Sequence, residues 1–312
     1  MALAYPFSLF LLLVLLSTNT SEATSRAPNR MLALVQQQPL VLKYHKGPLL
    51  KGNITLHLLW YGTFTPTQRS IILDFVQSLS ATSSIPSPSV FSWWQTTESY
   101  RGGPRTLVVG NQILDHTCSL GKSLKTNELL ALASNPKLTS AHDGHAVHVI
   151  LTSADVAVED FCMNQCGTHG SGRVMKGKRI AYAWVGNPVT QCPGQCAWPF
   201  HQPVYGPQTA PLVSPNGDVG VDGMIINLAT VLAGVVTNPF EDGYYQGSAS
   251  APLEAVSACT GIFGKGAYPG YVGNVLVEET TGASYNAVGV HGRKFLLPAM
   301  WDPRSSTCKT LV

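Results

Sequence analysis

Apolar and polar positions in the first half of the chain predict strands that alternate with helices. The segments 53–61 and 146–152 are nearly continuous apolar runs, which is typical of buried strands. In residues 68–79, apolar side chains recur at helical spacing just after the Thr65-Pro66 start signal, so we expect a helix there. The same patterns predict further strands over 105–110 and 180–184, and helices over 90–97 and 127–134. This alternation predicts an α/β fold built on a mixed sheet.

A longer apolar helix is predicted in the second half. It begins near Asp222, reads DGMIINLATVLAGVVTNPF and is stopped by Pro239. Its few polar or small residues fall on one face, so this stripe either packs against backbone or lines a cleft. The stripe consists of Asn227, Thr230, Gly234 and Thr237. Gly- and Pro-rich stretches at 186–223 and 243–286 predict long loops around the helix, which give the fold α+β character in its second half.

Composition indicates a folded protein and argues against binding to nucleic acid. The chain has 312 residues, of which 45% are hydrophobic and 12% charged, and its formal net charge is +3. Disorder requires low hydrophobicity with high net charge, so an unfolded chain is excluded. Binding to nucleic acid requires a strongly basic face or run, and the sequence has none. We therefore expect no nucleic-acid partner.

The N-terminus carries an export signal. Residues 1–23 hold an apolar core, SLFLLLVLL, which is shorter than the roughly 20 residues that span a membrane, and they end in a small-x-small cleavage site, SEA. A membrane anchor is the alternative. We expect a flexible tail over 24–38 and a single domain over 39–312, without a transmembrane segment, because the apolar run 224–236 suits a core helix. Asn53 begins an Asn-Ile-Thr glycosylation acceptor, as expected for a secreted protein.

Cysteine usage agrees with secretion. The seven cysteines are Cys118, Cys162, Cys166, Cys192, Cys196, Cys259 and Cys308. In an oxidising compartment most of them are expected to form disulfides, although the two CxxxC pairs also suit a four-thiolate zinc site. The four cysteines of these pairs allow three connectivities, which the sequence leaves open. Cys259 and Cys308 form a reasonable third pair, and Cys118 is then either free and buried or shared with another chain.

Few residues suggest catalysis. His169 in CGTHGSG and His201 in WPFHQP follow cysteines and could line one cleft, and Asp222 with Glu254 could form the acid/base pair of a glycosidase. His142, His145 and His148 would share a face only on a helix, and their segment enters a strand, so we interpret them as structural or surface residues. No nucleophile elbow, phosphate loop, HExxH or dinucleotide motif is present. We assign no catalytic residue, metal or cofactor.

Several long motifs resemble a plant family. LKYHKGPLLKGNITLHLLWYG, FCMNQCGTHGS, YAWVGNP, QCPGQCAWPFHQPVYGPQTAPLVSPNGDVGVDGMIINLATVLAG and TNPFEDGYYQG are similar to the Exordium-like proteins of the phosphate-induced protein 1 family, and the resemblance covers residues 39–312. It implies a secreted protein of the apoplast or cell wall with a role in growth and cell expansion and in the brassinosteroid response. The family carries no established catalytic residues, so none is transferred.

A second resemblance is shorter. Residues 230–239 resemble the metal helix of secreted zinc peptidase-like proteins, HELAEAVTDP, and residues 254–259 resemble their later acidic segment. In this alignment Thr230 and Gly234 replace metal ligands, Val231 replaces the general-base glutamate, and Ser257 replaces an aspartate. Because glycine and valine supply neither lone pair nor base, the resemblance implies a zincin-like scaffold without its metal. The candidate cleft therefore comprises His169, His201, Asp222, Asn227, Thr230, Gly234, Glu254 and Ser257.

Three functional interpretations follow. In the first, the protein is non-catalytic and binds a cell-wall component, a peptide or a receptor ectodomain through the cleft or through aromatic side chains. The aromatic candidates are Trp93, Trp94, Trp198, Tyr244, Tyr245, Tyr268 and Tyr271. The alternative is an extracellular hydrolase, peptidase- or glycosidase-like, which requires His169 or His201 to converge with Asp222 or Glu254. The third is a disulfide-tied structural wall protein without a saturable ligand.

Overall fold

The computed structural model describes residues 39–80, 85–138, 145–163, 165–173, 179–248 and 251–312. Residues Leu40–Val312 form one compact unit. The predicted signal segment 1–23 and tail 24–38 lie outside the described residues, and so does His142.

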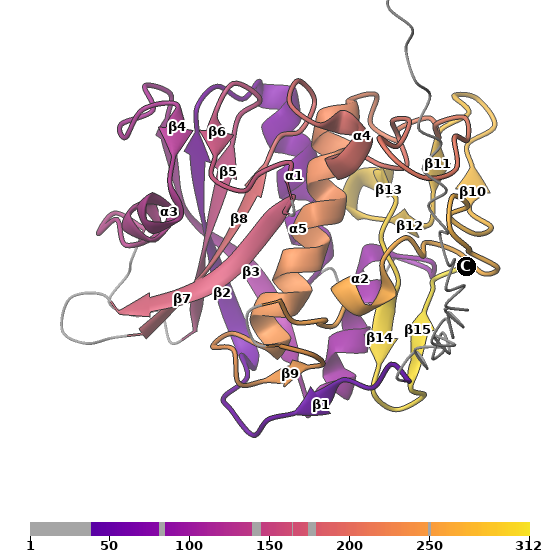
Figure 1. Cartoon of the computed structure of the whole chain (residues 1–312), viewed down its shortest axis with the longest axis horizontal. Coiled ribbons are helices and arrows are strands. Elements are labelled where there is room, and N and C mark those ends of the chain that lie inside the picture. The colour runs from indigo at the N-terminus through magenta and orange to yellow at the C-terminus, as the bar shows by residue number, and fades with distance from the viewer. Residues whose placement is uncertain (1–38, 81–84, 139–144, 164, 174–178, 249–250) are drawn as a thin grey trace, which may run out of the picture. The chain divides into compact units, whose positions relative to one another are not determined.

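The largest sheet of this unit has five strands, in the order β3-β2-β5-β8-β7 (Figure 1). The strands β2 (Gly52–Tyr61), β3 (Pro104–Asp115), β5 (Ala146–Thr152) and β8 (Arg179–Gly186) run parallel to one another. The edge strand β7 (Gly167–Arg173) is antiparallel to β8. The prediction of a mixed sheet is therefore confirmed.

Side chains of the sheet alternate between two cores, and each core is covered by helices. One face of β2, with Ile54 and Leu56, packs with α1 (Pro66–Ser78) and α5 (Val219–Thr237). The other face, with Leu59, packs with α3 (Thr126–Ala133). In Figure 1, α3 and α5 accordingly lie on opposite sides of the sheet. This arrangement buries both faces of the parallel strands and explains why those strands read as continuous apolar runs.

Local signals set the helix boundaries. Thr65 and Gln68 form a reciprocal capping box at the start of α1, as the Thr65-Pro66 signal predicted. At α5 the cap is Asp218, whose side chain accepts a hydrogen bond from the Val221 N–H, so the helix begins earlier than predicted. By length and composition α5 could cross a membrane, but 83% of its apolar window is buried inside the fold. It is a core helix, as predicted.

The remaining elements are short. The helices are α2 (Val90–Trp94), η1 (Gln95–Ser99), α4 (Pro193–Cys196), η3 (Ser257–Cys259) and η4 (Val290–Gly292). The strands, which form two-stranded ribbons, are β1 (Lys43–Tyr44), β4 (Ser123–Leu124), β6 (Ala157–Val158), β9 (Tyr244–Tyr245), β10 (Leu276–Val277), β11 (Ser284–Tyr285), β12 (Ala287–Val288), β13 (Lys294–Phe295), β14 (Met300–Asp302) and β15 (Thr307–Lys309). Long loops dominate the second half, as expected.

Candidate functional site

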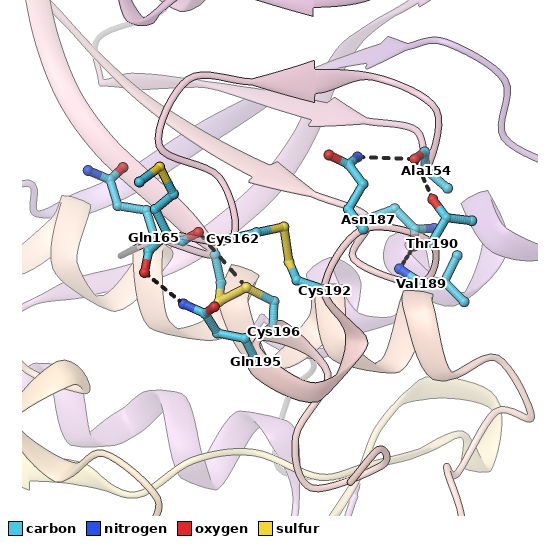
Figure 2. The surroundings of a disulfide bond; sticks show 12 residues. Ala154, Cys162, Gln165, Asn187, Val189, Thr190, Cys192, Gln195 and Cys196 are labelled. Atoms are coloured by element: carbon cyan, nitrogen blue, oxygen red, sulfur yellow. Dashed lines mark hydrogen bonds between the residues drawn. A yellow bond between two sulfur atoms is a disulfide. The ribbon is translucent and has the colours of Figure 1, made fainter. Parts of the chain in front are cut away.

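Two parallel disulfides brace the segment that leads into the site. Cys162 pairs with Cys192 and Cys166 with Cys196, each across 30 residues, and Figure 2 shows the two bonds close together. They connect the entrance of β7 to α4, and the Gln195 side-chain amide adds a hydrogen bond of 3.1 Å to the Met163 carbonyl. This connectivity is one of the three that the sequence allowed. Since all four sulfurs are bonded in pairs, the four-thiolate zinc alternative is wrong.

The other cysteines also have defined states. Cys259 pairs with Cys308, as predicted. Cys118 is free and buried, which is the first of the two predicted alternatives for this residue. Burial raises the pKa of the Cys118 thiol, so its thiolate form is disfavoured.

Trp198 follows the braced helix α4, and the two residues before Trp198 contact α5. The Asn227 side chain donates a hydrogen bond of 2.8 Å to the Cys196 carbonyl. A Cβ at Gly223 would lie 2.8 Å from the Cβ of Ala197, so glycine permits α5 to approach this closely. The Trp198 ring then lies 5.8 Å from the Phe263 ring, centroid to centroid. The predicted polar stripe of α5 thus packs against backbone at Asn227 and positions an aromatic side chain.

Two hollows meet at Trp198. The first, of about 280 Å³, is lined by side chains that include Trp198, His201, Thr209, Leu212, Tyr271 and Asn274. The second, of about 430 Å³, is lined by side chains that include Met163, Gln195, Trp198, Val204, Tyr205 and Pro207. Both hollows also share Gly270, so they adjoin at these two residues, and we call the pair of hollows the aromatic groove.

A tight turn supplies another part of the lining, with Gly270 and Tyr271. Tyr268 and Tyr271 exchange backbone hydrogen bonds of 3.0 and 2.8 Å, and their rings lie 5.1 Å apart. Gly270 has a φ of +88°, and a Cβ there would lie 2.6 Å from Pro207. Only glycine fits both conditions. The Thr209 hydroxyl donates a hydrogen bond of 3.2 Å to the Gly270 carbonyl, which joins the turn to the neighbouring loop.

Large side chains around the groove are unusually exposed. The exposed fraction is 86% for Tyr205, 72% for Met163 and 65% for Tyr268. Among the described residues, no Asp, Glu, Lys or Arg side chain lines either hollow. Exposed apolar patches that adjoin a concave surface are typical of interaction sites.

The other aromatic candidates do not belong to this surface. Trp93, Trp94 and Tyr244 are buried in the core. The Trp93 indole N–H donates a hydrogen bond of 2.7 Å to the Pro298 carbonyl. Tyr245 is half-buried and stacks on His45 with the ring centroids 3.7 Å apart. Stacking on a ligand by Trp93, Trp94 and Tyr244 is excluded because their rings are covered.

A second candidate site, which is polar, lies where β7 meets the C-terminal part of α5. The Nε2 atom of His169 lies 2.8 Å from Oε2 of Glu254, and the Asn238 side-chain amide donates a hydrogen bond of 2.6 Å to Oε1. The Ser257 hydroxyl accepts a hydrogen bond of 2.8 Å from the Glu254 N–H. A Cβ at Gly234 would lie 2.7 Å from both Glu254 Oε2 and His169 Nε2. Glycine at this point of the stripe therefore makes room for the pair.

Burial and an unsatisfied atom distinguish this His–Glu pair. The side chains of His169 and Glu254 are 10% and 13% exposed. Nδ1 of His169 is buried without a hydrogen-bond partner in the described structure. In the neutral imidazole that donates Nε2–H to the carboxylate, Nδ1 carries the lone pair.

Asp222 and His201 do not join this pair. Gly234 adjoins Glu254, and Asp222 lies 12 residues before Gly234 on α5, about 18 Å along the helix axis. The predicted acid/base pair of Asp222 and Glu254 is therefore wrong, because the two carboxyl groups are too far apart. Its carboxylate accepts hydrogen bonds of 2.9 and 2.6 Å from the backbone and the side chain of Asn216. Burial raises the pKa of Asp222 to about 7. His201 is exposed and lines the aromatic groove.

Thr230 does not face a metal site. Its hydroxyl donates a hydrogen bond of 2.9 Å to the Ile226 carbonyl of its own helix, and Thr237 does the same at 2.8 Å to the Ala233 carbonyl. Among the described residues, no group of three His, Cys, Asp or Glu side chains could hold a metal ion. The zincin-like scaffold remains a prediction from the sequence.

Sequence reasoning missed two features. The first is a buried pair of histidines, of which the sequence analysis named only His148. His148 contacts the Ala133 carbonyl through Nδ1, and its ring centroid lies 5.5 Å from that of His57. Val204 and Tyr205 were also missed as surface residues. Their position in the run QPVYGPQ, with no helical or strand period, was the available signal, because apolar residues in such loops are often exposed.

Fold and surface together define a disulfide-braced mixed-sheet protein with an aromatic surface groove. Residues 42–311 match the model of the phosphate-induced protein 1 conserved region. Protein EXORDIUM-like 2 of Arabidopsis thaliana is 61% identical over 321 residues, and the alignment covers 100% of each chain. Protein EXORDIUM-like 4 of the same plant is 54% identical over 314 residues, with 100% of each chain covered. Protein PHOSPHATE-INDUCED 1 of Nicotiana tabacum is 56% identical, with 92% of this chain and 93% of its own covered.

The chain therefore belongs to the phosphate-induced protein 1 family, which includes the Exordium-like proteins. The family resemblance predicted from the sequence motifs is confirmed. No solved structure matches the chain.

Proposed function

We propose that this protein is secreted to the apoplast, acts in growth and cell expansion with a response to brassinosteroid, and works by binding a cell-wall component rather than by catalysis. The observation that carries the binding step is the aromatic groove, where Trp198 and Tyr271 line a hollow beside the exposed Tyr205. The growth role rests on membership of the Exordium family.

Three further features support secretion. Three disulfides suit an oxidising compartment. Residues 1–23 have the composition of a signal peptide. Asn53, in the glycosylation acceptor, lies on an exposed position of β2. A fluorescent fusion tests this step: the full chain should accumulate outside the cell, and deletion of residues 1–23 should retain it inside. Retention of both fusions would contradict secretion.

Wall binding is tested with protein purified from the secreted fraction of a eukaryotic host. We expect saturable retention on isolated wall material, and Trp198→Ala should lower the affinity at least tenfold because it removes the ring shared by both hollows. Tyr245→Ala is the matched control, since this aromatic side chain lies outside the groove. Equal retention of both variants would show that the groove is not the binding site. Non-saturable retention would favour a structural wall protein. Receptor ectodomains and wall peptides are screened in the same format.

A second candidate function is an extracellular hydrolase, and the His169–Glu254 hydrogen bond of 2.8 Å favours it. The carboxylate would orient the imidazole, and Nδ1, which is buried here, would have to become accessible to a substrate before it could serve as a general base. The test is a screen of peptide and polysaccharide hydrolysis with wild type, His169→Ala and His201→Ala. Turnover that disappears only in His169→Ala would support hydrolysis and contradict a purely binding role. Turnover unaffected by His169→Ala would exclude this pair.

A further inference from the structure

We propose that the aromatic groove binds one uncharged polysaccharide chain, with sugar units on both sides of Trp198. This inference rests on the proposed wall binding and names the chemical class of its ligand. The three observations that carry it are the neutral lining, the division of the groove at Trp198 and the mixture of ring faces with polar side chains.

The neutral lining selects against charged ligands. A polyuronide or an acidic peptide that loses water on binding needs a cationic partner to offset the cost. Among the described residues the groove presents no Lys or Arg to supply one, and no Asp or Glu to receive a basic ligand. His201, whose Nδ1 lies 3.0 Å from the Gln202 carbonyl, is the imidazole of the lining. A ligand without charge meets no electrostatic penalty here.

The lining also matches the two kinds of surface that a sugar ring has. Aromatic faces of Trp198 and Tyr271 pack against the C–H face of a pyranose, as amphipathic rings do at interfaces. The hydroxyls around the ring edge need donors and acceptors, which Gln195, Thr209 and Asn274 supply along the groove. Both hollows contain at least one such polar side chain beside an aromatic ring. A chain of hydroxylated rings uses both kinds of group in each hollow.

Trp198 makes the two hollows one extended site. It lines both of them, as does Gly270, so the occupants of the two hollows are neighbours. A polymer that occupies both hollows pays the cost of association once and therefore binds more tightly than a short fragment. Affinity should consequently rise with chain length until both hollows are filled.

The groove is also held in shape before a ligand arrives. The Cys166–Cys196 disulfide ends two residues before Trp198, and the Asn227 side chain holds the carbonyl between them. On the other wall, Tyr268 and Tyr271 are joined by two backbone hydrogen bonds. Such preorganisation reduces the ordering cost that weakens binding by loops.

The experiment is calorimetric titration of the full secreted protein with neutral β-linked oligomers of glucose, xylose and mannose, each of two and six units. A six-unit galacturonic acid oligomer and a proline-rich peptide are the competing ligands. We expect one neutral hexamer to bind at least tenfold more tightly than its dimer and than both competitors. Its affinity should change less than about twofold between low and high salt, because no charge pair is formed.

Two groove variants and one control variant locate the ligand. Trp198→Ala should weaken hexamer binding at least tenfold, since the ring belongs to both hollows. Tyr205→Ala removes an exposed ring that lines only the second hollow, so it should reduce the advantage of hexamer over dimer and leave the fold intact. Tyr245→Ala should change neither affinity.

The outcomes separate this inference from the proposed function. Tighter binding of the acidic oligomer or of the proline-rich peptide overturns the neutral-polysaccharide inference while wall binding stands. Equal affinities for dimer and hexamer overturn the two-hollow arrangement. Saturable retention on wall material with no affinity for any neutral oligomer also overturns the ligand class. Absence of saturable wall binding removes the proposed function itself.

Discussion

Single residues in the core carry roles that their types alone do not reveal, and Asp222 is the clearest case. It is buried in the first turn of α5 and is bonded to Asn216 rather than to a catalytic partner. Burial raises its pKa from 3.8 to about 7. Between about pH 4 and pH 7 the folded state therefore binds a proton that the unfolded state has lost, so this carboxyl makes the protein less stable as pH rises through that range.

The prediction for Asp222 concerns this slope. The contribution of Asp222 to stability should fall by a few kcal/mol between pH 4.5 and pH 7.5, since each pKa unit corresponds to about 1.4 kcal/mol. Asp222→Asn removes this titration, so its stability should fall less over the same interval. Denaturant unfolding of both proteins at the two pH values gives the change in unfolding free energy of each. The contributions of all other titrating groups cancel when the two changes are subtracted. Parallel pH profiles for the two proteins would contradict a raised pKa.

Gly234 is the second residue whose role is steric. In an open helix, Gly→Ala stabilises by about 1 kcal/mol. Here the new Cβ would lie 2.7 Å from His169 Nε2 and from Glu254 Oε2, so Gly234→Ala should instead destabilise by about 1–3 kcal/mol. Thermal or chemical unfolding gives the sign. The cost should shrink in a His169→Ala background, because one of the two clashing groups is then absent. A stabilising Gly234→Ala would show that the pair does not occupy this space.

At the scale of elements, the sequence patterns predicted those strands and helices whose apolar residues face a core. Strands β2, β5 and β8, and helices α1 and α5, lie where periodicity placed them. Strand β7 was missed because its sequence, GTHGSGR, has three glycines and no large apolar residue, and it joins the sheet through backbone hydrogen bonds to β8. Strand β3 continues beyond the predicted 105–110 to Asp115, because its pairing with β2 extends that far.

The candidate site could be predicted only in part, for a related physical reason. Sequence pointed to His169 and Glu254 as chemistry-bearing residues, but these lie 85 residues apart, and pairing them depended on how β7 packs beside α5. Sequence also could not separate Trp93, which is buried, from Trp198, which lines the groove. Exposure of an aromatic ring is set by tertiary packing, and single-residue preferences do not determine it.

At the scale of the whole molecule, the disulfides have two different roles that one comparison can separate. Cys166–Cys196 closes 30 residues beside the aromatic groove, and Cys259–Cys308 closes 49 residues and includes a cysteine buried in the main core. Constraint of the unfolded chain predicts up to about 4 kcal/mol of stabilisation from Cys259–Cys308, and less from Cys166–Cys196 because Cys162–Cys192 already closes nearly the same loop. Both double Cys→Ala variants should therefore unfold at lower denaturant concentration than wild type.

Binding should distinguish the two variants although their stabilities fall together. Loss of Cys166–Cys196 leaves α4 tied only at its start by Cys162–Cys192 and loosens its end, two residues before Trp198, so retention on wall material should weaken at least tenfold at a temperature where the protein remains folded. Loss of Cys259–Cys308 should leave retention within about twofold of wild type under the same conditions, because the braced α4 segment is unchanged. Circular dichroism at the binding temperature verifies the folded state of each variant. If both variants bind as wild type does, the disulfide brace contributes to stability alone and the groove does not depend on it for its shape.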